Sequence, residues 1–184
     1  SMIGFVFLAF FIAIIGIYTW ANNFYGKVGN FEITLSSSTF LFVLLIPILT
    51  MRVLAEEKHQ KTDQLLYTAP ISIGRVIIGK YLALITLFGI GVLFVGLYPL
   101  MKRHYSPDSV QLAPAYSALI GFFLLGAAYI AIGTFISSLT ESQPIAAVVS
   151  FLVLLMSVLV SSIAGALPSD KLSQAAILSV VWII

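Results

Sequence analysis

The sequence contains no cysteine, which excludes a disulfide framework, a thiolate zinc site, an iron–sulfur cluster and a cysteine nucleophile. Charged residues are also scarce: they make up 9% of the 184 residues, whereas a soluble domain usually carries about 25%. The formal net charge of +2 is too small to indicate a nucleic-acid partner. Hydrophobic residues account for 60% of the chain and the mean hydropathy is +1.10. This composition predicts an integral membrane protein.

Long uncharged runs divide the chain into predicted membrane spans. A helix needs about 20 apolar residues to cross the hydrocarbon core. The predicted spans cover residues 2–21, 35–51, 81–101, 115–139 and 145–167, and a sixth begins at about residue 172. We therefore expect an all-α integral membrane protein, with a single transmembrane domain over residues 1–184 and a truncated last helix. The span at 35–51 is short, and its serine and threonine hydroxyls must lie at the interface or bond back to the helix.

The basic residues indicate the orientation. Five of them, Arg52, Lys58, Lys61, Arg75 and Lys80, fall between the second and third predicted spans. Since lysine and arginine concentrate in short cytoplasmic loops, we place residues 52–80 in the cytoplasm.

Residues 52–80 form the only long polar segment of the chain. Residues 52–60 are good helix formers that extend the second span, and Thr62 is a candidate N-cap for a short second helix that Pro70 ends. Ser72 can then cap the helix of the next span. The pattern predicts a long helix, a short capped helix lying across it, and a return to the membrane. An ordinary solvated loop is the alternative.

One set of residues in this segment matches a family signature: Arg52, Glu56, Glu57, Lys58, Thr62, Leu65, Leu66, Pro70, Ile71, Ser72, Gly79 and Lys80. The set resembles the cytoplasmic-loop signature of ABC-2 type ABC transporter permeases, most closely the gliding-motility permease branch. Two residues depart from that pattern, because Lys61 stands where it usually has glycine and Gln64 where it often has glutamate.

The resemblance implies a six-helix ABC-2 permease of a bacterial cytoplasmic membrane, here without the family's N-terminal elbow helix. Two such subunits, identical or related, would dimerise around a translocation pathway of an exporter, and cytoplasmic ABC ATPase subunits would hydrolyse the ATP. The short helix at residues 63–68 would be the coupling helix. The residues implied in ATPase coupling are Arg52, Glu56, Glu57, Lys58, Thr62, Asp63, Leu65, Leu66 and Pro70.

Two patterns could indicate a nucleotide site or a metal site, but each lacks a residue that such a site requires. Gly74–Lys80 matches the first seven positions of a Walker A motif, but Tyr81 replaces the required serine or threonine and a membrane span follows. His59 and His104 have no second metal ligand at useful spacing. We therefore expect no cofactor, no metal and no ATP site in this chain, and we do not expect an enzyme.

The second to fifth predicted spans contain no Asp, Glu, Lys, Arg or His. Ionisable residues within a membrane usually mark an ion or proton path, so their absence weakens one alternative, a gradient-driven secondary transporter or channel. A membrane scaffold without transport activity is the other alternative. An apolar pathway is compatible with lipids, hydrophobic drugs, peptides or a glycan, and no motif selects among these substrates.

Pro47 lies within the second predicted span, where it removes a backbone donor and leaves the Val43 carbonyl free. It is either a hinge above the cytoplasmic segment or a tolerated membrane proline. Small residues at four-residue spacing permit close helix approach, within the subunit or in a dimer. The pairs are Ala127 with Ala131 and Gly133 with Ser137.

Overall fold

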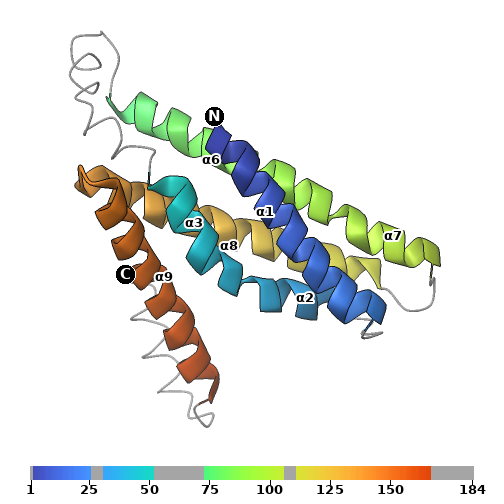
Figure 1. The fold of residues 1–184 in the computed structure, drawn as a ribbon. Coiled ribbons are helices and arrows are strands. Elements are labelled where there is room, and N and C mark those ends of the chain that lie inside the picture. The colour runs from blue at the N-terminus through green and yellow to red at the C-terminus, as the bar shows by residue number, and fades with distance from the viewer. Residues whose placement is uncertain (1, 26–30, 52–72, 106–110, 167–184) are drawn as a thin grey trace.

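The computed structural model describes residues 2–25, 31–51, 73–105 and 111–166, and every regular element in these ranges is a helix (Figure 1). The elements are α1 (Met2–Thr19), the π-helix η1 (Trp20–Tyr25), α2 (Phe31–Ser38), α3 (Phe40–Thr50), α6 (Ile73–Val95), α7 (Leu97–Tyr105), α8 (Leu112–Leu139) and α9 (Gln143–Ala166). The all-α prediction is confirmed for this part of the chain. The predicted sixth span lies outside it.

Four described stretches are long and apolar enough to cross a membrane: Gly4–Asn22, Gly74–His104, Leu112–Leu139 and Gln143–Ile163. They overlap the predicted spans at residues 2–21, 81–101, 115–139 and 145–167. The remaining predicted span, residues 35–51, is divided between α2 and the 11-residue α3.

Hydroxyl groups explain the interruption between α2 and α3. Ser37 Oγ donates to the Ile33 carbonyl at 2.8 Å, Ser38 Oγ to the Thr34 carbonyl at 2.7 Å, and Thr39 Oγ1 to the Leu35 carbonyl at 3.2 Å. The Thr39 N–H donates to the Ser36 carbonyl at 3.1 Å, three residues back, which tightens the turn. Such back-bonding bends helices, and it is one of the two arrangements expected from the sequence.

A second interruption separates α6 from α7 at Gly96. Pro99 has no N–H, so the Val95 carbonyl loses its helical donor. The hydroxyl of Tyr116, on α8, donates to the Gly96 carbonyl at 3.3 Å. The break is therefore stabilised by a neighbouring helix, and we did not predict it from the sequence.

Aromatic rings from four helices fill the core. Phe11 of α1, Phe42 of α3, Phe88 of α6 and Phe122 of α8 are all buried. The ring centroids of Phe42 and Phe122 are 4.4 Å apart, and the Phe88 centroid is 5.5 Å from those of Phe11 and Phe42. Helix α8 lies at the centre of this packing and contacts α2, α3, α6, α7 and α9 (Figure 1).

Gly126 of α8 allows α8 to approach α6 closely. A Cβ atom at this position would overlap the buried ring of Phe88. We expect Gly126→Ala to lower the free energy of unfolding by about 1–3 kcal/mol, because the ring must shift within a filled core. Thermal unfolding in detergent, followed by circular dichroism, measures this. Gly121→Ala is the matched control, since no atom lies within 4 Å of a Cβ there. Equal stability of the two variants would show that the core accommodates the methyl group.

Helix α9 contacts α3 and α8 but leaves the bundle toward its C-terminal end (Figure 1). In the most apolar 18-residue stretch of α9 only 17% is buried, whereas the corresponding share in α8 is 44%. Large apolar side chains therefore remain exposed along α9, among them Val148, Leu152, Met156 and Leu159.

Candidate coupling end and membrane surface

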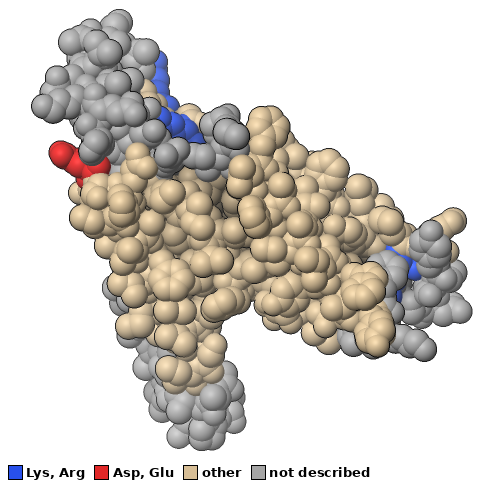
Figure 2. All heavy atoms as spheres, viewed as in Figure 1, with Lys and Arg blue, Asp and Glu red and all other residues tan. Residues whose placement is uncertain are grey.

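Basic side chains lie at two levels along α6 and α7. Lys80 and Lys102 are 22 residues apart, which is about 33 Å along a helix and close to the ~30 Å thickness of the hydrocarbon core. Arg75 and Arg103 are about 42 Å apart by the same rise, which matches a bilayer with its headgroups. Figure 2 shows basic side chains near both ends of the molecule and an uncharged surface between them. The two levels are therefore spaced as the two surfaces of a membrane are, although the Lys102 side chain is itself buried in the protein.

The residues predicted to contact an ATPase lie outside the described residues. They are Arg52, Glu56, Glu57, Lys58, Thr62, Asp63, Leu65, Leu66 and Pro70. The structure describes what flanks this segment: α3 and Met51 before it, and α6 from Ile73 after it.

The first flank is attached to α8. Ser137 Oγ donates to the Met51 carbonyl at 3.3 Å. One turn earlier on α8, a Cβ atom at Gly133 would overlap Thr50 Oγ1 and lie 3.0 Å from Thr50 Cβ. Thr50 is itself held, because its Oγ1 donates to the Ile46 carbonyl at 2.9 Å. Gly133 and Ser137 thus serve close packing within the subunit, which is one of the two uses expected for this pair.

The second flank is attached to the same helix. The hydroxyl of Tyr81 on α6 donates to the Ala127 carbonyl of α8 at 3.2 Å. Met51, just before residues 52–72, and Tyr81, in the third turn of the helix that follows them, are therefore both hydrogen-bonded to α8.

Residues 73–80 form the first two turns of α6, in agreement with the prediction that Ser72 caps this helix. The helix contains both Gly74 and Gly79 of the Walker-like pattern. A phosphate-binding loop presents free backbone N–H groups just before a helix, whereas both glycines lie within the helix. Nothing lies within 4 Å of a Cβ built on either of them. This geometry gives no support to a nucleotide site there.

Pro47 is buried within α3, and the helix continues past it to Thr50. The Met51 N–H donates to the Pro47 carbonyl at 2.9 Å, which closes the last turn. Val43, whose carbonyl lacks its usual helical donor because of Pro47, is fully buried. Pro47 thus lies one turn before Met51, whose carbonyl accepts the hydrogen bond from Ser137.

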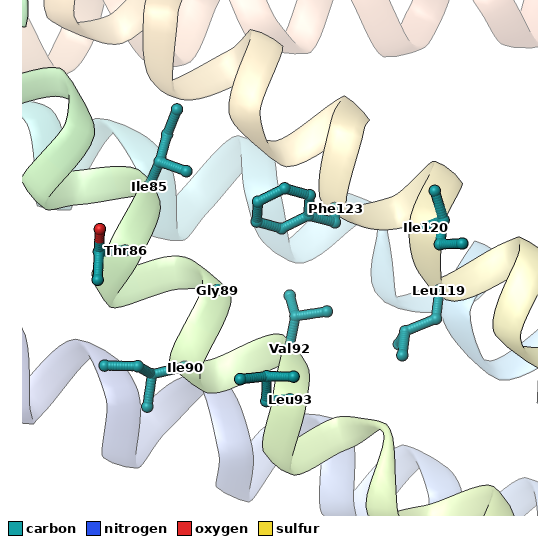
Figure 3. Close-up of a pocket in the computed structure, with 9 residues that line it drawn as sticks. All are labelled: Ile85, Thr86, Gly89, Ile90, Val92, Leu93, Leu119, Ile120 and Phe123. Carbon is teal, nitrogen blue, oxygen red and sulfur yellow. The ribbon is translucent and has the colours of Figure 1, made fainter.

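Two hollows follow the seam between α6 and α8, and we did not predict either. One, of about 470 Å³, lies between Ile77, Ile78 and Tyr81 of α6 and Ala131, Phe135 and Ser138 of α8. The other, of about 500 Å³, lies between Ile85, Gly89 and Leu93 of α6 and Leu119, Ile120 and Phe123 of α8 (Figure 3). Its lining is apolar apart from Thr86, whose Oγ1 donates to the Leu82 carbonyl at 2.8 Å.

Within the described ranges, no group of three or more His, Cys, Asp or Glu side chains is placed to hold a metal ion. His104 lies in the last turn of α7, and His59 falls outside these ranges. The features found in these ranges are therefore the contacts of α8 with α3 and α6 and the apolar hollows between α6 and α8.

These helices and the distribution of charge define the class: the chain is a multi-pass membrane protein. The family follows from comparison with known proteins. A family model described as ABC-2 family transporter protein matches residues 17–183, and the chain belongs to this family. It is a transport permease, a membrane subunit and not itself catalytic. Searches of curated proteins and of solved structures found no match.

Proposed function

We propose that this chain is the permease subunit of an ATP-driven ABC-2 type exporter in a bacterial cytoplasmic membrane. Two permease subunits, identical or related, form the translocation pathway between them. Cytoplasmic ABC ATPase subunits dock on the segment at residues 52–72 and supply the energy. The signature residues of that segment favour the gliding-motility branch within the family, and six membrane-spanning helices are part of this proposal.

The attachment of both flanks of residues 52–72 to α8 carries this proposal. Ser137 bonds to Met51 on one side, and Tyr81 bonds to the Ala127 carbonyl on the other. A segment that docks an ATPase must pass its movement into the membrane as rigid-body motion, since a loosely attached loop would absorb it. Helix α8 is suited to receive that movement, because it is the most buried of the spanning helices and contacts five others.

The packing of the core supports a pathway between two subunits. Phenylalanine rings from α1, α3, α6 and α8 fill the centre of the described bundle. A substrate that crossed through this centre would have to displace those rings. A pathway along the surface of the bundle, shared with a second subunit, avoids this cost.

Reconstitution tests the proposed function. The full-length permease and the ABC ATPase encoded beside it are placed together in proteoliposomes, and ATP hydrolysis is measured. We expect the permease to raise hydrolysis above that of the ATPase alone, vanadate to abolish the increase, and an ionophore that collapses ion gradients to leave it unchanged. Hydrolysis that does not respond to the permease would favour a gradient-driven carrier or a scaffold.

Pro47→Ala tests whether α3 acts as a hinge. Alanine restores an N–H to the Val43 carbonyl and stiffens the helix one turn before Met51. We expect the variant to bind the ATPase as the wild type does, but to change the permease-dependent rate of ATP hydrolysis. Co-purification and the vanadate-sensitive rate measure the two effects separately. A wild-type rate would show that Pro47 is a tolerated membrane proline.

A further inference from the structure

We propose that the seam between α6 and α8 binds one acyl chain of an anionic phospholipid, whose phosphate lies on Arg75. The lipid belongs to the leaflet on the side of Arg75 and Lys80. This inference does not depend on the proposed transport function.

The depth of the two hollows fits a single leaflet. On α6 they run from Ile77 to Leu93, which is about 24 Å along the helix. A hydrocarbon core of ~30 Å placed between Lys80 and Lys102 puts the bilayer midplane near Gly91. The hollows therefore begin at headgroup level and end close to the midplane. An acyl chain of one leaflet has this extent, whereas a spanning helix of a second copy would need a groove through both leaflets.

The lining of the seam fits a hydrocarbon chain. Around the deeper hollow the side chains are aliphatic or aromatic, and the Thr86 hydroxyl is bonded within its own helix (Figure 3). In the shallower hollow the Tyr81 hydroxyl donates to the Ala127 carbonyl and Thr134 Oγ1 donates to the Ile130 carbonyl at 2.7 Å. Ser138 Oγ donates to the Phe135 carbonyl at 2.6 Å. All four hydroxyl hydrogens that line the hollows are thus already used, so an occupant without polar groups leaves none of them unsatisfied.

Arg75 supplies the charge at the correct depth and on the correct face. It is exposed, and it lies seven residues before Leu82 and 14 before Gly89. Residues at this spacing stay near one face of a helix. Gly89 lines the deeper hollow, so Arg75 lies on α6 near the same helix face and closer to the membrane surface. Arginine binds phosphate through two parallel hydrogen bonds, which favours an anionic phospholipid headgroup.

A photo-crosslinking experiment tests this site. The full-length protein is placed in nanodiscs containing phosphatidylglycerol with a diazirine on its acyl chain, and labelled peptides are identified by mass spectrometry. We expect labelling of α6 and α8 around Gly89 and Phe123. Gly89→Leu should fill the hollow, since a Cβ there makes only ordinary contact, 3.5 Å from Phe123 Cε2. We expect it to reduce labelling about tenfold, as for a lost apolar contact of leucine size. Gly121→Leu, at an open position on α8, should label as the wild type does.

The headgroup contact is tested with surface variants. Arg75→Gln should lower the preference for phosphatidylglycerol over phosphatidylcholine about fivefold, the effect of one basic residue near an anionic membrane surface. Arg103→Gln, at the other membrane surface, should not change it. Undiminished labelling of Gly89→Leu, or an equal loss of preference in both arginine variants, would overturn the proposal. Efficient disulfide formation between two copies of a Leu93→Cys variant would also overturn it, because it would assign the seam to a second copy of the chain.

Discussion

Reversing the charges of Glu56 and Glu57 to lysine is expected to release the ATPase while the permease still inserts into the membrane. Placing like charges opposite each other at an interface costs several kcal/mol, so we expect the fraction of ATPase that co-purifies to fall at least about tenfold. Size-exclusion chromatography of the co-expressed, full-length proteins measures this fraction. The amount of permease recovered from the membrane should stay at the wild-type level, because both residues lie outside the predicted spans.

Glu141→Lys is the matched control for this charge reversal. Glu141 is an exposed acidic residue two positions after the end of α8, and Ser137 near the same end of α8 bonds to Met51, just before residues 52–72. We expect this variant to retain the ATPase. If it released the ATPase as fully as the double reversal, net charge at this end would matter and the assignment of Glu56 and Glu57 would be wrong.

Gly133→Ala is expected to uncouple the ATPase from the membrane helices. The added methyl group would overlap Thr50 Oγ1 and force α3 away from α8 beside the attached flank. We expect a loss of about 1–3 kcal/mol in the free energy of unfolding, as for other overpacked cores. The ATPase should still bind. The permease-dependent part of ATP hydrolysis should fall, because Ser137 Oγ can no longer donate to the Met51 carbonyl once α3 has moved. Both quantities are measured on the same purified complex.

A second substitution separates the contact from a general effect on folding. Thr50→Ala removes the hydroxyl and methyl groups that the new Cβ would meet, so it should restore much of the hydrolysis in the Gly133→Ala background. Gly121→Ala, with open space around its Cβ, should behave as the wild type in both measurements. A double variant no better than Gly133→Ala alone would show that the contact with Thr50 does not carry the coupling.

The helices could be predicted from the sequence better than their interruptions. Long uncharged runs specify membrane helices, because the backbone must satisfy its own hydrogen bonds in lipid. The breaks at Thr39 and Gly96 depend on finer features. The first needs several hydroxyls to bond back at once, and the second combines Pro99 with a hydrogen bond from Tyr116, 20 residues away in the sequence.

The start of α6 could be predicted from local signals. Ser72 is a candidate cap for the helix that leads into the next span, and the structure begins α6 at Ile73. The basic side chains of Arg75 and Lys80 are compatible with this helix, because long basic side chains can extend to the headgroups from a helix that is entering the membrane.

The role of α8 could not be predicted from local sequence. Its hydrogen bonds to the two flanks join residues 46 and 86 positions apart in the chain. The sequence did indicate that Gly133 and Ser137 permit close approach, but it left the partner open. The structure identifies that partner as the end of α3. The hollows of the α6–α8 seam were missed for the same reason, since they depend on how two helices pack.

The composition of the complex purified from the native host tests the central claim most directly. The full-length protein is extracted in mild detergent, and the proteins that accompany it are identified and quantified by mass spectrometry. We predict an ABC ATPase in a stoichiometric amount, and its loss when Glu56 and Glu57 are changed to lysine. A permease that purifies without an ATPase, and that stimulates no ATP hydrolysis by the neighbouring ATPase, would contradict the account.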